Sequence, residues 1–219
     1  MSETFEIARK NMVVNQLRPN KINEENILKI FENTPKENYL DVSLGKNCYL
    51  DNNLDITDKR GYLKNLHLAQ IIKYSKILPN DKVLHIGGLT GYFSALIGSL
   101  CQELHVVEEN RELFKLLEHN ISNTDTSNIS LFNHNLLDGL VDKAPFNLII
   151  IDGPIFKITD NLKKQLVTNG GRLIYIKKIY DNLGKAYKVI RNEDLYSSEY
   201  LFDVMSTYQI QEQQEGFKF

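Results

Sequence analysis

Short apolar runs alternate with amphipathic stretches from residue 82 onward, and this alternation limits the possible folds more than any other feature of the chain. The run at 146–151, FNLIII, is almost wholly apolar, as expected of a central strand buried on both faces. Strands that alternate with helices pair in parallel through right-handed crossovers, so we predict a doubly wound α/β sheet. Its expected strands are 82–86, 104–108, 129–133, 146–151 and 171–177, and its expected helices are 91–101, 110–120 and 159–166.

The chain departs from this alternation at both ends. Residues 39–63 carry the Asn, Asp and Gly punctuation of irregular structure. Near the C-terminus, extended segments at 185–192 and 198–205 flank a polar turn and predict an antiparallel hairpin that closes the sheet edge. We expect one compact unit, with a helical N-terminal cap at 1–78 and the sheet domain at 79–219. Apolar residues at helical spacing predict the cap helices 3–17, 24–33 and 64–77.

Composition gives few hints of a partner. The formal net charge is −2, with acids and bases interspersed, so neither nucleic acid nor a membrane is expected as a partner. Cys48 and Cys101 stand in unrelated contexts and the histidines lack ligand spacing, so we expect no disulfide framework and no metal. The N-terminus lacks the apolar run of a signal peptide, and Leu148–Ile151 is too short to cross a bilayer. We expect a soluble cytoplasmic protein, and the sequence indicates no oligomeric state.

A glycine-rich turn, GGLTG at 87–91, separates the strand 82–86 from the next helix. A dinucleotide fingerprint would need glycines at Leu89 and Tyr92, and no Gly-Lys-Ser/Thr follows. The turn keeps the first and last glycines of a G-x-G-x-G loop, the form used for S-adenosyl-L-methionine. Glu108 lies 21 residues after the first glycine, a spacing that suits an acid bonded to a ribose. A nucleotide-type site and a purely structural strand-to-helix turn both fit this pattern.

Further segments carry a signal in their order and spacing. They are NMVVNQLRPNKI (11–22), VLHIGGLTGYFSALIGSL (83–100), VVEEN (106–110), APFNLIIIDG (144–153) and QLVTNGGRLI (165–174). Together they resemble the protein-L-isoaspartate O-methyltransferase family over nearly the whole chain. The resemblance implies a Rossmann-like class I methyltransferase fold and S-adenosyl-L-methionine as cofactor. It also implies protein repair by methylation of the side carboxylate of L-isoaspartyl residues in damaged proteins.

The resemblance also implies, by position, which residues form the site. Glu108 would hold the ribose hydroxyls, and Asn135 would read the adenine. Arg60, Tyr62 and Asp152 are the substrate-side candidates. The substrate carboxylate is ionised at neutral pH, so the site must orient it rather than move a proton. The implied cofactor-binding residues are His85, Gly87, Gly88, Leu89, Thr90, Gly91, Glu108, Asn135 and Leu136.

The chain departs from the family pattern at several positions. His85 and Asn135 replace acids and Leu89 replaces the central glycine, while Asn147 replaces the acid after APF. A lost charge-assisted hydrogen bond costs roughly 1.5–3 kcal/mol, and a left-handed leucine roughly 1–2 kcal/mol. Cofactor binding would then be weaker by about two to four orders of magnitude. On the substrate side, Leu63 stands where the family has a serine hydroxyl.

These departures leave two other functions open. One is a non-catalytic relative that uses the fold for binding or scaffolding, and the other is a methyltransferase with a different acceptor. Three plain structural interpretations also remain. His85 fits a hydrogen-bonded histidine at a strand end, and Asp152 fits a turn after a strand. Arg60 and Tyr62 fit a loop surface.

Overall fold

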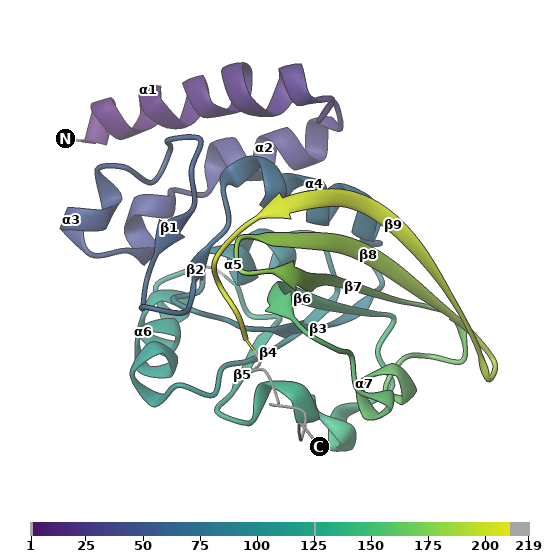
Figure 1. Ribbon diagram of the computed structural model, residues 1–219. Helices are drawn as coiled ribbons and strands as arrows, with labels where there is room; N and C mark the ends of the chain where they lie inside the picture. The colour runs from purple at the N-terminus through teal and green to yellow at the C-terminus, as the bar shows by residue number, and fades with distance from the viewer. Residues whose placement is uncertain (1, 125, 211–219) are drawn as a thin grey trace, which may run out of the picture.

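The computed structural model describes residues 2–124 and 126–210 and has a seven-stranded sheet at its centre (Figure 1). The strand order is β5-β4-β3-β6-β7-β8-β9, parallel from β5 to β7 and antiparallel from β7 to β9. The chain order reverses at β3, and ligands of open α/β sheets bind beyond the carboxyl ends of strands at such a switch point. The strands are β3 (Lys82–Ile86), β4 (Glu103–Val107), β5 (Ile129–Phe132), β6 (Leu148–Ile155), β7 (Asn169–Tyr180), β8 (Leu183–Asn192) and β9 (Leu195–Met205).

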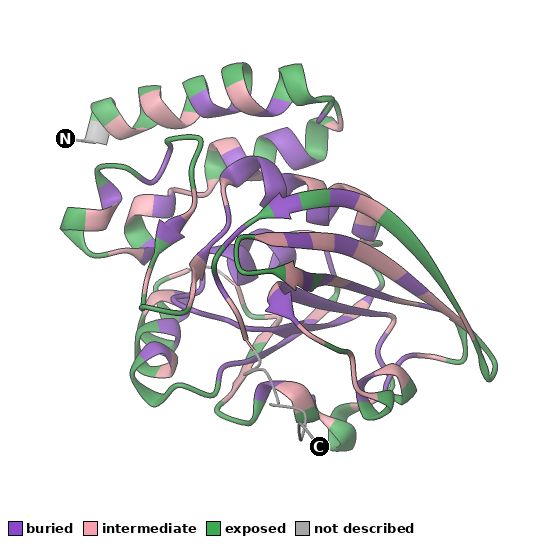
Figure 2. Cartoon of the chain, viewed as in Figure 1, coloured by how far each residue is buried: buried purple, intermediate pink, exposed green. Residues whose placement is uncertain are grey.

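Alternate side chains of the central strands pack on opposite faces of the sheet, because successive residues of a strand point to opposite sides. Leu148 and Ile150 belong to the larger apolar cluster, whereas Ile149 and Ile151 belong to a second cluster on the other face. Both faces of β6 are therefore buried, and the central strands are purple in Figure 2. The pattern explains why this strand reads as an uninterrupted apolar run.

The helices cover the sheet on both sides, with α1 and α2 stacked beyond α4 and with α7 on the opposite side (Figure 1). No helix within the described ranges is apolar over enough residues to cross a membrane. The α-helices are α1 (Ser2–Met12), α2 (Glu25–Asn33), α3 (Val42–Gly45), α4 (Asn65–Ser75), α5 (Tyr92–Gly98), α6 (Arg111–Ser122) and α7 (Asp160–Lys164). The single-turn elements are the π-helix η1 (Val13–Leu17) and the 3-10 helices η2 (Arg18–Asn20), η3 (Lys36–Tyr39), η4 (Leu136–Asp138) and η5 (Val141–Lys143).

The predicted fold class is confirmed, and two local predictions are wrong. The segment 39–63 is not irregular throughout, since it contains α3 and a small sheet of β1 (Leu54–Asp55) and β2 (Gly61–Tyr62). Asp152 does not follow its strand but lies inside β6, where the pairing with β7 shifts between Ile150 and Pro154. That irregularity lets the strand continue through a Gly-Pro pair that reads as a strand end in the sequence.

The last described residues after β9 cross back over the sheet and form the C-terminal strap, residues 206–210. Gln209 N–H donates to the Lys59 carbonyl at 3.0 Å, and Ile210 N–H donates to the Pro154 carbonyl at 2.9 Å. Tyr208 Oη donates to Asp55 Oδ1 at 2.6 Å. The strap therefore ties the β1–β2 segment to the end of β6, beside the switch point.

Candidate active site at the glycine-rich turn

The glycine-rich turn follows β3 and begins α5, and its backbone needs residues that tolerate positive φ. Gly87 and Gly91 have φ values of 101° and 102°, and Leu89 has φ 48°. A side chain at Gly91 would also lie 3.2–3.3 Å from Leu117 and Ile121 of α6. Both glycines are thus required by the local backbone.

Leu89 occupies the central position of the turn at a left-handed backbone that usually favours glycine. Its side chain is 2% exposed and belongs to the large apolar cluster that also contains Leu113 and Leu117 of α6. Burial of a leucine contributes about 1.5–3 kcal/mol, which offsets the roughly 1–2 kcal/mol cost of the backbone conformation. The leucine's bulk is therefore part of the core.

Tyr62 forms hydrogen bonds to the glycine-rich turn through its hydroxyl group. Its Oη accepts hydrogen bonds from the N–H groups of Thr90 at 3.2 Å and Tyr92 at 3.1 Å. It also lies 2.9 Å from Thr90 Oγ1. Tyr62 is fully buried, so its interpretation as loop surface is wrong. The ring enters the core because β2 pairs with β1 and turns the side chain inward.

Replacing Tyr62 by phenylalanine is expected to lower the free energy of unfolding by about 2–4 kcal/mol. The loss leaves two buried N–H groups of the turn without an acceptor, at about 1–3 kcal/mol for each unsatisfied group. Urea denaturation followed by circular dichroism measures the change. Tyr180→Phe is the matched control, because Tyr180 is 69% exposed and its substitution should change stability by less than about 0.5 kcal/mol.

A buried lysine supports Tyr62 and was not anticipated from the sequence. Lys36 Nζ lies 5.2 Å from the ring centroids of both Tyr62 and Tyr92 and donates to Asn65 Oδ1 at 3.0 Å. Burial lowers the pKa of Lys36 to about 8, although the nearby Cys48 opposes that shift. Cation–π contact with two rings explains how an ammonium group can be held beneath the turn without a carboxylate.

Glu108 and Arg60 form the main ion pair of the site. Glu108 follows β4, is fully buried, and receives Arg60 Nη1 at 2.6 Å and Nη2 at 2.8 Å on its two oxygens. The carboxylate also accepts the N–H groups of Leu89 and Asn110, each at 3.0 Å. Both oxygens are thus fully engaged by the chain itself.

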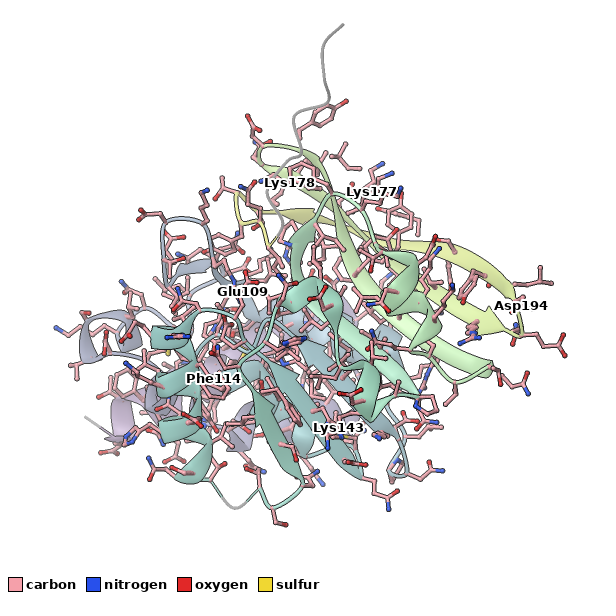
Figure 3. All side chains as sticks on the ribbon, turned by 90° about the horizontal axis from the view of Figure 1, so that it is seen from below. Glu109, Phe114, Lys143, Lys177, Lys178 and Asp194 are labelled. Carbon is pink, nitrogen blue, oxygen red and sulfur yellow. The ribbon has the colours of Figure 1, made fainter. Side chains whose placement is uncertain are left out.

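Arg60 reaches this carboxylate from the loop between β1 and β2. Its side chain is 13% exposed, so the loop-surface interpretation is wrong for Arg60 as well. Burial alone would lower the pKa of Arg60, but hydrogen bonds and charge from Glu108, with smaller contributions from Asp152 and Glu109, raise it above its usual value. Of these neighbouring carboxylates, Glu109 is labelled near the centre of Figure 3. The guanidinium is therefore a permanent cation at the switch point.

Asp152 and His85 lie side by side beneath the turn. His85 Nε2 is 3.5 Å from Asp152 Oδ2, and His85 Nδ1 is 2.9 Å from Ser94 Oγ. The histidine is fully buried against Phe93, with ring centroids 5.3 Å apart. These contacts fit a hydrogen-bonded histidine of the core. Asp152 Oδ1 instead faces Gly87, where an added Cβ would lie 3.0 Å from it.

The adenine-side candidates lie on the loop after β5. Asn135 is exposed, and its side chain accepts the Leu137 N–H at 3.0 Å, which caps η4. Leu136 is buried in the second apolar cluster, and its N–H donates to Glu109 Oε2 at 3.3 Å. The loop that carries both residues thus lies beside Glu109, and the side-chain oxygen of Asn135 is used within the loop itself.

Besides Asp152, two further side chains of the chain itself lie over the first glycine. A Cβ added at Gly87 would lie 3.3 Å from Ile210 Cδ1 and 3.4 Å from Arg60 Nη2, and one at Gly153 would lie 2.6 Å from Ile210 Cγ1. The acid, the glycine cradle and the flanking loop thus fit a nucleoside-type cofactor. Arg60 and Ile210 must move aside before such a group can contact Gly87 and Glu108.

The fold and the position of the turn place the chain among Rossmann-like class I methyltransferases. The sequence profile described as Protein-L-isoaspartate(D-aspartate) O-methyltransferase matches residues 8–205. The chain therefore belongs to the protein-L-isoaspartate O-methyltransferase family.

Curated relatives agree with this assignment. A protein named Protein-L-isoaspartate O-methyltransferase from Koribacter versatilis (strain Ellin345) is 29% identical over 170 residues, which is 78% of this chain and 76% of the relative. Another of the same name from Shewanella woodyi (strain ATCC 51908 / MS32) is 29% identical over 199 residues, covering 91% of this chain and 92% of the relative. The similarity spans most of both molecules.

Two solved structures share the fold. One named protein-L-isoaspartate O-methyltransferase superposes with a TM-score of 0.77 at 19% identity and covers 91% of this chain, which spans 65% of that structure's length. The other, a putative protein-L-isoaspartate O-methyltransferase from Plasmodium falciparum in complex with S-adenosyl-L-homocysteine, has a TM-score of 0.75 at 16% identity. That superposition covers 91% of this chain and 97% of the chain of the solved structure.

Proposed function

We propose that this chain is a cytoplasmic S-adenosyl-L-methionine-dependent carboxyl O-methyltransferase that acts on L-isoaspartyl residues of damaged proteins. The observation that carries the proposal is Glu108, a fully buried carboxylate at the end of β4 beside the glycine-rich turn. An acid in this position of an α/β sheet bonds ribose hydroxyls. Membership of the family and the relatives' names support the same reaction.

The residues that would hold the cofactor are those of the switch point. Gly87 lets its chain approach the backbone, Gly91 keeps the turn close to α6, Glu108 would accept the ribose hydroxyls, and Asn135 and Leu136 would flank the adenine. Bound S-adenosyl-L-methionine supplies an electrophilic methyl group. The carboxylate of Asp152, next to Gly87, favours a cationic ligand in this space.

Arg60 links cofactor binding to substrate binding in this proposal. It is paired with Glu108 in the structure and would be released when ribose hydroxyls take over the carboxylate. The freed guanidinium lies beside Gly87, and guanidinium groups bind carboxylates in a bidentate manner. Arg60 can thereby supply the contact that Leu63 cannot make. No general base is needed, because the isoaspartyl carboxylate is already ionised.

The test is methyl transfer from radiolabelled S-adenosyl-L-methionine to an isoaspartyl peptide, with the same peptide containing ordinary aspartate as the control. We expect a base-labile methyl ester on the isoaspartyl peptide alone. Equal labelling of both peptides would point to a different acceptor. No labelling of either at millimolar cofactor, while S-adenosyl-L-homocysteine binding is still detected calorimetrically, would replace the proposal with a non-catalytic role.

A further inference from the structure

One face of the β7–β8–β9 meander combines tyrosines with lysines. The strand register places Tyr175, Tyr187 and Tyr200 in one row across the three strands, and Lys177 opposite Lys185 in the neighbouring row. Tyr175 and Tyr187 stack with ring centroids 5.7 Å apart, and Tyr187 meets Tyr200 edge to face at 6.0 Å. These five residues are called the tyrosine–lysine face below.

The two faces of the meander differ in what covers them. Ile176, Ala186 and Phe202 of the opposite face are buried in the large apolar cluster. On the tyrosine–lysine face, Tyr200 is 50% exposed and Lys177 is exposed. In Figure 3, Lys177 lies toward the carboxyl end of β7, whereas Asp194 marks the far tip of the β8–β9 hairpin. The face therefore offers side chains to a partner near the carboxyl end of β7.

A cavity of about 480 Å³ lies where this face meets the segment between β6 and α7. Cations from three elements line it, namely Lys157 after β6, Lys163 of α7 and Lys177 of β7. Tyr196 and the hydroxyl-bearing Ser198 line it from β9. This volume is within the usual range of ligand pockets, and the three lysines suit an anionic occupant.

The local charge is positive although the whole chain has a formal net charge of −2. Among the described residues that line the cavity, Lys157, Lys163 and Lys177 are cations and none is a carboxylate. The neighbouring Asp160 pairs with Lys163 at 2.6 Å, and Asp203 lies opposite Lys185 on β9. Cations thus outnumber carboxylates, which gives the region charge complementarity to an acidic partner.

The cavity begins four residues along the chain from Asp152 of the proposed site of methyl transfer. Its lining residue Phe156 follows Pro154, whose carbonyl anchors the strap, and comes four residues after Asp152. Four residues of strand span at most about 13 Å. An extended peptide that places one residue at Asp152 therefore reaches the cavity with residues about three to five positions away.

We propose that the cavity and the tyrosine–lysine face bind an acidic segment of the polypeptide substrate, three to five residues from the isoaspartyl residue. A peptide fits better than single-stranded nucleic acid, because the tyrosine rings pack against one another instead of offering separate faces to bases. The catalytic readout of this inference rests on the proposed function, whereas its binding readout does not.

The binding test uses a dye-labelled peptide with Asp and Glu residues and no isoaspartate, and a counterpart with Asn and Gln. Anisotropy should show tighter binding of the acidic peptide, and the double variant Lys157→Ala/Lys177→Ala should weaken it about tenfold. The control Lys10→Ala/Lys115→Ala removes two exposed lysines of α1 and α6 and should leave binding unchanged. Equal binding of both peptides, or no effect of the first double variant, overturns the inference.

The kinetic test compares isoaspartyl peptides with acidic and neutral flanks. The acidic flank should lower KM, and Lys157→Ala/Lys177→Ala should remove that advantage while kcat is unchanged. If the wild-type protein methylates neither peptide, the proposed function fails and the anisotropy result alone decides this inference. Single-stranded DNA and the unlabelled acidic peptide are also compared as competitors of the labelled peptide. If the DNA displaces it at a lower concentration than the unlabelled peptide does, the face binds nucleic acid and the proposal is contradicted.

Discussion

Replacing Arg60 by alanine is expected to destabilise the free protein by about 3–5 kcal/mol and to tighten S-adenosyl-L-homocysteine binding at least about tenfold. Stability falls because Glu108 is left as a buried carboxylate without its cation. Affinity rises because the ribose hydroxyls no longer compete with a charge-assisted pair worth roughly 1.5–3 kcal/mol. Urea denaturation with and without the ligand, together with titration calorimetry, measures both quantities.

The control for this substitution is Arg18→Ala. Arg18 pairs with Glu25 at 3.1 Å, but its side chain is 47% exposed, so its removal should cost no more than about 1 kcal/mol and leave ligand affinity unchanged. An Arg60→Ala variant that binds S-adenosyl-L-homocysteine more weakly than the wild type would show that Arg60 holds the cofactor. The exchange described above would then be incorrect.

Replacing Glu108 by glutamine is expected to weaken S-adenosyl-L-homocysteine binding by roughly tenfold to a hundredfold and to destabilise the fold by about 3–5 kcal/mol. The neutral amide cannot form the charge-assisted bonds to ribose, and it leaves the Arg60 guanidinium buried and unpaired. The same calorimetry and denaturation measurements apply.

The double variant Arg60→Ala/Glu108→Gln separates the two roles of the acid. Each single variant leaves one buried charge without its partner, whereas the double variant leaves none. The loss of stability in the double variant should therefore be smaller than the sum of the two single losses. Its ligand affinity should remain low, because the ribose acceptor is missing. Purely additive effects on stability would contradict the strong pairing of these two groups.

Much of the fold could be predicted because its signals are local. The five residues of β3 follow from a short apolar run, and β6 reads as a buried strand because both of its faces pack on helices. The hairpin of β8 and β9 follows from two extended segments around a polar turn. The β1–β2 pair was missed because strands of two residues have no periodicity to detect.

The site was only partly predictable, because some of its contacts join residues that are far apart in the sequence. The glycine-rich turn and Glu108 are recognisable from the spacing of nearby residues. The pairing of Arg60 with Glu108 joins positions 48 apart, and no sequence pattern reports which buried groups meet across such a distance. Lys36 beneath Tyr62 and Ile210 over Gly87 were missed for the same reason, and an isolated lysine or isoleucine gives no signal of its own.

The anchoring of the C-terminal strap has a consequence for how ligands enter. Consecutive N–H groups, those of Gln209 and Ile210, donate to carbonyls of two different segments, Lys59 of the β1–β2 loop and Pro154 of β6. Breaking one of these hydrogen bonds therefore strains the other. Admission of a cofactor and loosening of the β1–β2 arm that carries Arg60 then become a single cooperative event, observable as the amide protons of Gln209 and Ile210 exchanging with solvent at one common rate.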